Sequence, residues 1–255
     1  MEYLELIKVC AGHLHNARRI CVLTGAGVSQ ESGVPTFRDA LDGLWARYDP
    51  QQLATPQAFR RDPKLVWDWY EYRRQRVRAA QPNPGHSALA ALQQRFPTLR
   101  IITQNVDDLH ERAGSTDVIR LHGNIALSKC SAACRGEPTW VDVNALQDAP
   151  EQGPPHCPYC GQLVRPDVVW FGENLPRQQL DRAMQLAQSC DLMLVVGTSG
   201  VVSPASTLPS LARRAGALLI EVNPFVSEIT PLVRYHIVES SGVALPALVT
   251  ALDSA

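Results

Sequence analysis

The chain has 255 residues, of which 45% are hydrophobic and 19% charged, and its formal net charge is −1. This composition excludes a disordered chain. The near-neutral charge argues against a general nucleic-acid binder, which needs a concentrated basic face. No apolar run approaches the roughly 20 residues of a membrane helix, so no membrane association is expected. The first 19 residues predict a surface helix and lack the apolar centre of a signal peptide, so we expect a cytoplasmic protein.

Short, apolar, β-branched runs alternate with helical patterns along most of the chain. This alternation is typical of an α/β fold, a Rossmann-like doubly wound parallel sheet. The expected strands are residues 20–24, 100–103, 118–121, 167–170, 192–196, 218–222 and 236–239. The expected covering helices are the Ala/Leu-rich run after residue 86 and residues 175–188, 204–215 and 243–252.

Two regions interrupt the alternation and predict a second, smaller lobe. Residues 41–84 are mostly helical with prolines as punctuation, whereas residues 128–164 are rich in Pro, Cys and Gly. The other segments, 1–40, 85–127 and 165–255, make up the predicted Rossmann-like domain. A doubly wound sheet binds ligands outside the carboxyl ends of its strands, so a small lobe standing there would close a cleft.

A glycine-rich stretch, TGAGVSQESGVPTFR, follows the first expected strand. Glycines at such a point let bare backbone N–H groups approach a phosphate. The spacing is not the GxGxxG of a dinucleotide fingerprint, because Gly25 and Gly27 are followed by a third glycine only at Gly33. On these residues alone, a phosphate cradle and a tight loop without a ligand remain alternatives.

Four cysteines form two pairs within the second insertion, Cys130 with Cys134 and Cys157 with Cys160. This spacing predicts one tetrahedral Zn²⁺ site. All four ligands would be cysteine, which leaves no open position, so the zinc should be structural and not catalytic. Four unrelated thiols or two disulfides are the alternatives. The other three cysteines lie in apolar surroundings and are expected in the core.

Polar side chains also follow two other expected strands. ITQNVDDLH places Gln104, Asn105 and Asp107 where their amides and carboxylate suit nicotinamide and ribose, although Asn105 or Asp107 could instead cap the next helix. In VIRLHG, His122 ends another strand, where a histidine facing the cleft is well placed as a general base. A buried structural histidine is the alternative.

These motifs and their order resemble those of the sirtuins, which are NAD-dependent protein lysine deacylases. The matching segments are GAGVSQESGVPTFR, TQNVDDLH, LHG, the two cysteine pairs, VVWFGE, GTSGVVSPAS and EVNP. The resemblance implies NAD as co-substrate, one structural zinc per chain, and acylated lysine proteins or peptides as substrates. It also implies that residues 41–84 contain a cofactor loop besides the helical module. We expect a monomer without direct nucleic-acid or membrane partners.

The resemblance further implies roles for individual residues. His122 is the implied general base, and Asn105, the second implied catalytic residue, binds the nicotinamide carboxamide with Asp107, while Gln104 lies at the nicotinamide ribose. The implied cofactor-binding residues are Gly25, Ala26, Gly27, Ser29, Thr36, Phe37, Arg38, Gln104, Asn105, Asp107, Gly197, Thr198, Ser199, Asn223, Pro224 and Ser241. Ser29 and Arg38 are implied to sit on the cofactor loop. A peptide substrate is implied to add as a strand beside Val169, Trp170, Phe171, Gly172 and Glu173.

One helical segment, LVWDWYEYRRQRV, bears on the acyl group. Tyr70 and Arg73 share a helix face, where a phenol and a guanidinium could converge on one carboxylate. An exposed basic helix end is the alternative. Together with Ala58, a small residue that would widen the pocket, the pattern is similar to that of class III sirtuins, which prefer succinyl, malonyl or glutaryl lysine. Removal of acetyl groups is expected alongside.

Two functions of other classes would require residues that differ from those present. A non-catalytic sensor of NAD or ADP-ribose predicts loss of the base, whereas His122 is present. A zinc-ribbon nucleic-acid binder needs basic and aromatic residues around the cysteines, and only Lys129, Arg135 and Arg165 lie nearby. A plain deacetylase, or an ADP-ribosyltransferase using the same cofactor site, remains an alternative.

Overall fold

The computed structural model describes residues 2–34, 48–146 and 153–253, and within them six parallel strands form one sheet in the order β3-β2-β1-β6-β7-β8. The strands are β1 (Ile20–Thr24), β2 (Arg100–Thr103), β3 (Ile119–Arg120), β6 (Leu192–Val196), β7 (Leu218–Val222) and β8 (Tyr235–Ile237). The chain winds outward from β1 to β3 and then returns to β6, which pairs with β1 on its other side. The winding therefore reverses between β1 and β6, and a doubly wound sheet binds ligands at such a switch point. The predicted fold class is confirmed.

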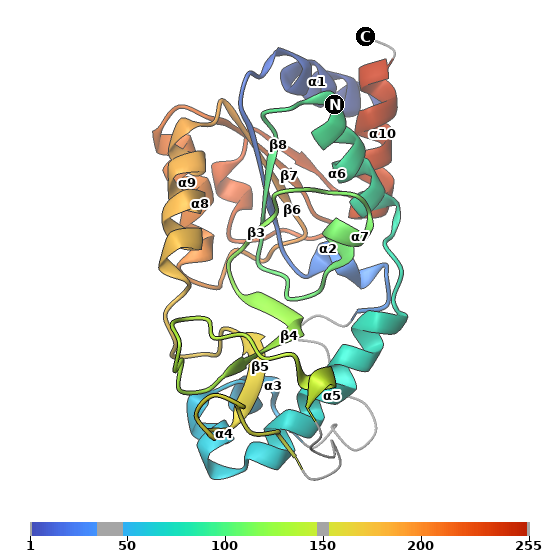
Figure 1. Cartoon of the computed structure of the whole chain (residues 1–255). Coiled ribbons are helices and arrows are strands. Elements are labelled where there is room, and N and C mark those ends of the chain that lie inside the picture. Colours follow the sequence, from blue (N-terminus) through green and yellow to red (C-terminus); the bar gives the residue numbers. More distant parts are fainter. Residues whose placement is uncertain (1, 35–47, 147–152, 254–255) are drawn as a thin grey trace.

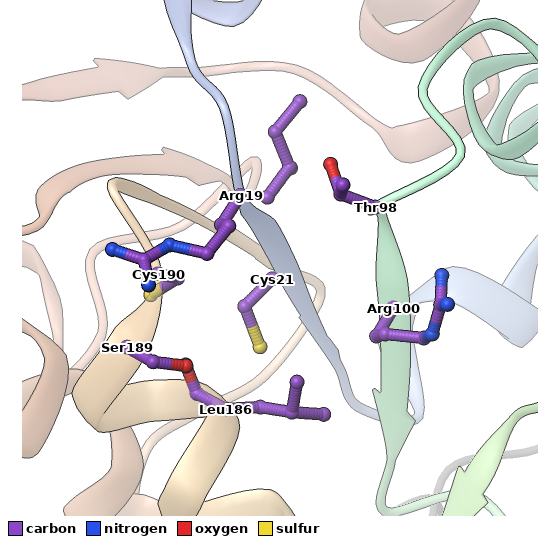
Figure 2. A pocket seen from close by; sticks show the side chains of 8 residues that line it. Arg19, Cys21, Thr98, Arg100, Leu186, Ser189 and Cys190 are labelled. Atoms are coloured by element: carbon purple, nitrogen blue, oxygen red, sulfur yellow. The ribbon is translucent and has the colours of Figure 1, made fainter.

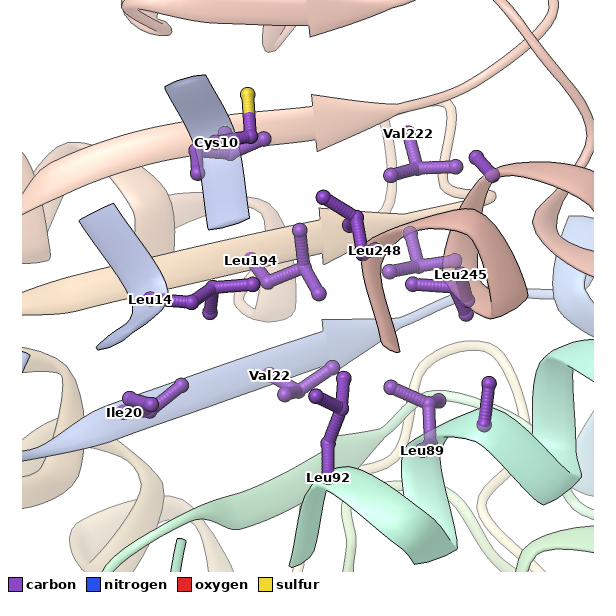
Figure 3. Packing of buried hydrophobic residues seen from close by; sticks show 14 of the residues in the cluster. Cys10, Leu14, Ile20, Val22, Leu89, Leu92, Leu194, Val222, Leu245 and Leu248 are labelled. Atoms are coloured by element: carbon purple, nitrogen blue, oxygen red, sulfur yellow. The ribbon is translucent and has the colours of Figure 1, made fainter. Parts of the chain in front are cut away.

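Both faces of this sheet are buried, because successive side chains of a strand point to opposite faces and helices cover each one. Ile20 and Val22 of β1 pack against helices on one face (Figure 3), whereas Cys21 and Leu23 pack against helices on the other. The first face is covered by α1 (Tyr3–Asn16), α6 (Pro84–Arg95) and α10 (Ser241–Asp253), and the second by α8 (Arg177–Ser189) and α9 (Leu208–Arg214). The apolar runs of the sequence thus become the two halves of one core.

The smaller lobe lies beyond the carboxyl ends of the strands (Figure 1). It contains the helices α3 (Pro50–Leu53), α4 (Pro56–Arg61) and α5 (Pro63–Ala79), and an antiparallel pair of strands, β4 (Gly123–Cys130) and β5 (Val164–Val168). Helices α4 and α5 begin where the sequence offers an N-cap followed by proline, since Thr55 and Asp62 accept hydrogen bonds from backbone N–H groups three residues later.

Short elements shape the loops between these layers. They are α2 (Gly27–Gln30), α7 (Leu109–Arg112) and the 3₁₀ turns η2 (Val143–Ala145), η4 (Ala205–Thr207) and η5 (Thr230–Leu232). Among the described residues, no helix combines the length and apolar character needed to cross a membrane.

Two predicted elements differ from the structure. The predicted strand 167–170 is wrong as a member of the parallel sheet: β5 ends at Val168 and pairs antiparallel with β4 in a separate two-stranded sheet. Pro166 lies within β5, and proline cannot donate to the hydrogen-bond ladder of a central strand. The predicted helix 204–215 divides into η4 and α9, with Pro209 in the first turn of α9. The boundaries of the three predicted domain segments stay predictions.

Candidate active site

The loops that follow β1 and β6 touch each other at the switch point. Gly25 N donates to Val196 O at 3.0 Å, and Gly27 N donates to Gly197 O at 2.8 Å. A Cβ atom on Gly25 would lie 2.7 Å from Gly197 O, and Gly197 itself has a φ of +59°. A side chain at either position would collide with the opposite backbone, so glycine is required for this approach. The loops bring Gly25, Ala26 and Gly27 beside Gly197.

A buried polar cluster lies beside these loops. Ser29 is on the one-turn helix α2 and is 1% exposed, and its expected place on the cofactor loop stays a prediction. Its Oγ donates to Asp107 Oδ2 and accepts from Asn105 Nδ2, each at 3.0 Å. His86 Nδ1 accepts from Asn83 N at 3.3 Å, so the neutral ring carries its proton on Nε2, which lies 3.4 Å from Ser29 Oγ. Three side chains thus meet at one hydroxyl.

The protonation of this cluster follows from its burial. Burial raises the pKa of Asp107 above 3.8, and the hydrogen bonds from Leu109 N and Ser29 Oγ oppose part of that rise. Burial also lowers the pKa of His86 to about 4 and that of His110 to about 3, and the two rings lie 5.0 Å apart. Both histidines are therefore neutral at pH 7.

A second chain of hydrogen bonds ends at the backbone N–H of Asn105. His110 Nε2 lies 3.0 Å from Thr24 Oγ1, which donates to Thr103 Oγ1 at 2.9 Å, and Thr103 Oγ1 accepts from Asn105 N at 3.0 Å. Sequence reasoning missed this chain and also His86. The available signal was a threonine ending each of two adjacent buried strands, Thr24 and Thr103, which pair in register.

His122 lies between β3 and β4 and is oriented by one hydrogen bond. Its Nδ1 lies 2.8 Å from the carbonyl oxygen of Gln104, and because a carbonyl only accepts, Nδ1 carries the proton and Nε2 keeps a free lone pair. Burial lowers the pKa of His122 below 6.5, although the bond to Gln104 O opposes that shift. The ring is therefore neutral at pH 7 and can accept a proton at Nε2. The side chain of Gln104 donates to Thr198 Oγ1 at 3.0 Å and links the ends of β2 and β6.

The remaining residues expected at the cofactor follow β6 and β7. Asn223 Nδ2 donates to Thr198 O at 3.0 Å, and Ser199 O accepts from Glu228 N at 3.1 Å, so these two loops are tied together. Pro224 is exposed beside them. Ser241 lies apart at the start of α10, where its Oγ donates to Glu31 Oε2 at 3.1 Å. Three further residues expected at the cofactor lie outside the described residues: Thr36, Phe37 and Arg38.

The residues expected at the acyl group come together in the smaller lobe. Tyr70 and Ala58 are buried in one apolar cluster with Trp170, whose Nε1 donates to the Tyr70 hydroxyl at 2.9 Å. The guanidinium carbon of Arg73 lies 5.7 Å from the centre of the Tyr70 ring. Burial lowers the pKa of Arg73, while Tyr70 and Asp107 oppose that shift. Arg73 therefore lies within range of the charge of Asp107.

The segment VVWFGE is held mainly through its own backbone N–H groups. Val169 N donates to His122 O at 3.0 Å, Phe171 N donates to Ala54 O at 2.9 Å, and Trp170 N donates to Glu173 Oε2 at 2.8 Å. Gly172 has a φ of +88°, which favours glycine at this turn. Because these three N–H groups are bonded within the protein, they are not available to an added peptide strand. Phe171 is exposed.

The four cysteines meet as predicted. Their sulfur atoms all lie within 4.8 Å of one another, with Cys130 Sγ 3.5 Å from Cys160 Sγ and Cys134 Sγ 3.9 Å from Cys157 Sγ. Four thiolates at a Zn–S distance of about 2.3 Å around a tetrahedral zinc would lie about 3.8 Å apart, so the donor set fits this ion. The cysteines are free, which excludes the alternative of two disulfides. Four sulfur ligands leave no position for water, so the site is structural.

A separate cavity of about 230 Å³ opens at the amino ends of β1 and β2 (Figure 2). Arg19 and Arg100 at its rim already pair with Asp191 and Asp117. Burial raises the pKa of Cys190 in its wall to about 11, so this thiol is protonated at neutral pH. The cavity lies at the opposite ends of the strands from the glycine loops and takes no part in the site.

The fold and the site together define a nucleotide-binding α/β protein with a cysteine-ligated module. A model of the Sir2 family matches residues 25–204 of the chain. The chain is 51% identical over 243 residues to the NAD-dependent protein deacylase of Methylococcus capsulatus, with 94% of each protein covered. It is 54% identical over 241 residues to NAD-dependent protein deacylase 1 of Pseudomonas aeruginosa, over 92% of this chain and 94% of that relative.

Solved structures agree with these relatives. A crystal structure of a Sir2 homologue in complex with NAD superposes with a TM-score of 0.87 at 43% identity, over 97% of this chain and 94% of that chain. A Sir2 complex with p53 peptide and NAD⁺ superposes with a TM-score of 0.85 at 30% identity, over 98% and 99%. The chain therefore belongs to the Sir2 family, as its motifs indicate.

Proposed function

We infer that the protein is an NAD-dependent protein lysine deacylase. One observation carries this conclusion: two groups lie at the carboxyl ends of strands beside the switch point. The first is His122 with its free Nε2, and the second is the buried cluster of Ser29, Asn105 and Asp107. The family membership and the names of the curated relatives support it. One solved Sir2 complex also holds a p53 peptide with NAD⁺, which supports a peptide substrate.

The protein's own groups account for each part of this reaction. Bound NAD supplies an electrophilic ribose carbon with nicotinamide as its leaving group. Asn105 and Asp107 would hold the nicotinamide carboxamide, and His122 Nε2 would accept a proton as the general base. The backbone at Gly25, Ala26 and Gly27 would line the diphosphate. The loops after β6 and β7 would hold the adenosine side of NAD through Gly197, Thr198, Ser199, Asn223 and Pro224, and Ser241 would be the residue on the adenine side.

The acyl preference follows from the charge at the far end of the site. Tyr70 offers a phenolic proton and lies in one apolar cluster with the small Ala58, and the guanidinium of Arg73 lies beside the Tyr70 ring. Charge-assisted hydrogen bonds from such donors favour a terminal carboxylate over a methyl group. The proposed substrates are therefore succinyl- and malonyl-lysine peptides, with acetyl-lysine accepted alongside.

The acyl preference can be tested by removing both donors. Tyr70→Phe combined with Arg73→Met keeps most of the side-chain volume, and desuccinylation efficiency should fall by about 10²-fold. Deacetylation should change by only a few-fold. The measured quantity is the ratio of kcat/KM for succinyl- and acetyl-lysine peptides of one sequence, because the ratio cancels general damage to folding or NAD binding.

A matched control lies on the same helix. Tyr72 and Arg76 form a hydrogen-bonded pair of 2.7 Å on α5, and Tyr72→Phe with Arg76→Met makes the same chemical change elsewhere. This control should leave the ratio of the two activities unchanged. If the test variant loses both activities equally, Tyr70 and Arg73 serve the helix and not the acyl group, and the function reduces to plain deacetylation.

A further inference from the structure

The hydroxyl of Tyr70 has an unusual partner 100 residues further along the chain. Trp170 Nε1 can only donate, so at 2.9 Å the phenolic oxygen accepts this hydrogen bond. A phenolic O–H lies near the plane of the ring, so an oxygen that accepts on one side directs its own proton to the other. A hydroxyl that already accepts a hydrogen bond is also a stronger donor.

We propose that Trp170, held in place by Arg165, is a positioning residue that turns the Tyr70 hydroxyl proton toward the carboxylate of an acidic acyl group. This inference rests on the proposed role of Tyr70 in binding that carboxylate. It assigns Trp170 a function in acyl selection besides its place in the peptide-binding segment, and it brings Arg165 into the determination of specificity.

Contacts within the protein hold both the indole ring and the backbone of Trp170. The guanidinium carbon of Arg165 lies 3.3 Å from the centre of the Trp170 ring, and the Phe59 ring packs 5.2 Å from it. Arg165 Nη1 and Nη2 bind the two carboxylate oxygens of Glu173 at 2.5 and 2.9 Å, and Glu173 Oε2 accepts from Trp170 N at 2.8 Å. Arg165 therefore contacts the ring of Trp170 directly, and its ion-pair partner Glu173 binds the backbone N–H of Trp170.

Tyr70, Trp170 and Arg165 are almost fully buried. Trp170 is 2% exposed, Arg165 is 7% exposed and Tyr70 is fully buried, so few other positions are open to the indole N–H. Arg165 Nη2 also donates to Val168 O at 2.8 Å, which ties the guanidinium to the end of β5. The orientation of the Tyr70 proton is thus set by packing that is in place before a substrate binds, which is the condition for preorganised recognition.

A double-mutant cycle on the full-length protein separates positioning from simple packing. Trp170→Phe removes the N–H donor and keeps an aromatic ring under Arg165. The KM for a succinyl-lysine peptide should rise about fivefold with a smaller change in kcat, and the succinyl-to-acetyl ratio of kcat/KM should fall about fivefold. In a Tyr70→Phe background the same substitution should change that ratio less than about twofold, since the hydroxyl on which the donor acts is absent.

Two further variants complete the experiment. Arg165→Lys keeps the Trp170 donor but loses the planar, bidentate grip, and it should lower the ratio about twofold to threefold. It also gives the answer if Trp170→Phe does not fold. Trp67→Phe is the control. It removes an indole from α5, the helix that carries Tyr70, but in the cluster beside the cysteines, and it should leave the ratio unchanged.

The outcomes distinguish this inference from the function on which it rests. If Tyr70→Phe alone leaves the ratio unchanged, Tyr70 does not bind the acyl carboxylate and both ideas fall. If Tyr70→Phe lowers the ratio but Trp170→Phe leaves it unchanged, or lowers it equally in both backgrounds, only the positioning role of Trp170 is overturned.

Discussion

The larger lobe and the cysteine module of the smaller lobe are stabilised by different means. In the larger lobe, buried aliphatic side chains cover both faces of the parallel sheet. In the smaller lobe, the buried cluster beside the cysteines consists of Trp67, Val141, Val164 and two of the cysteines themselves. Hydrophobic burial therefore stabilises the larger lobe, whereas the cysteine module depends on its metal because so little apolar surface is buried around it.

The smaller lobe also relies on buried arginines. Arg74 donates to the carbonyl oxygens of Ile125 and Leu127 and joins α5 to β4, and Arg165 pairs with Glu173. Guanidinium groups suit this use because they offer several donors in a fixed plane. His122, the proposed base, therefore follows an edge strand of the parallel sheet, whereas Tyr70 and Arg73, the proposed acyl-selecting residues, stand on a lobe that is joined by polar links.

The largest effect is expected from loss of the metal site, which should unfold the cysteine module and leave the larger lobe folded. Cys157→Ser should remove stoichiometric zinc and unfold the cysteine module, because a closed zinc site contributes about 10 kcal/mol of apparent binding energy to folding. Hydrogen exchange should show loss of protection around β4 and β5, while β1 and β6 stay protected. Metal content and exchange are measured on the same preparation.

Cys190→Ser is the matched control, because it alters a buried cysteine that packs against the sheet. This variant should keep its zinc. A Cys157→Ser protein that is active without bound metal, or one whose sheet loses protection together with the module, would contradict the separation of the two lobes.

A smaller effect is expected at the edge of the larger lobe. His122→Ala should lower turnover by about 10²-fold or more, equivalent to about 2.7 kcal/mol, because it removes the proposed general base. Binding of NAD and peptide, measured by calorimetry, should persist and both lobes should stay folded.

The pH dependence of the parent enzyme checks the same residue. His122 must be neutral to act, and its pKa lies below 6.5, so the acid limb of kcat/KM should fall below pH 6.5. Parent-like turnover by His122→Ala would show that another residue is the base.

The smallest effect concerns the buried histidines. Unfolded His110 binds a proton below pH 6.5, whereas in the folded protein its pKa is about 3. Between these values the unfolded state holds more protons, so the free energy of unfolding decreases as pH falls. His110→Gln should reduce this slope by up to about 1.4 kcal/mol per pH unit between pH 4 and 6. Urea unfolding of parent and variant at each pH measures it, and equal slopes would show that His110 is not buried in its neutral form.

Much of the larger lobe could be predicted from the sequence. The bounds of β1, β2, β6 and β7 match the predicted strands, because unbroken apolar runs mark strands that are buried on both faces. The cysteine spacing likewise predicted the cluster of four sulfur atoms.

The missed features depend on contacts between distant residues. The pairing of β4 with β5 joins polar segments that show no clear alternation. The Tyr70 to Trp170 hydrogen bond spans 100 residues, and the buried partners of His86 and His110 leave no periodic signal in the sequence. Local patterns report burial, but they do not report which buried polar groups will meet.

The most direct test of the central claim weighs the products of the unmodified protein. It is incubated with NAD and with succinyl- or acetyl-lysine peptides of one sequence, and the products are measured by mass spectrometry over time. We expect nicotinamide, free-lysine peptide and O-acyl-ADP-ribose in equal amounts, with the succinyl peptide consumed at the higher kcat/KM. Release of free lysine without NAD, or transfer of ADP-ribose to protein while the acyl-lysine stays intact, would contradict the assignment.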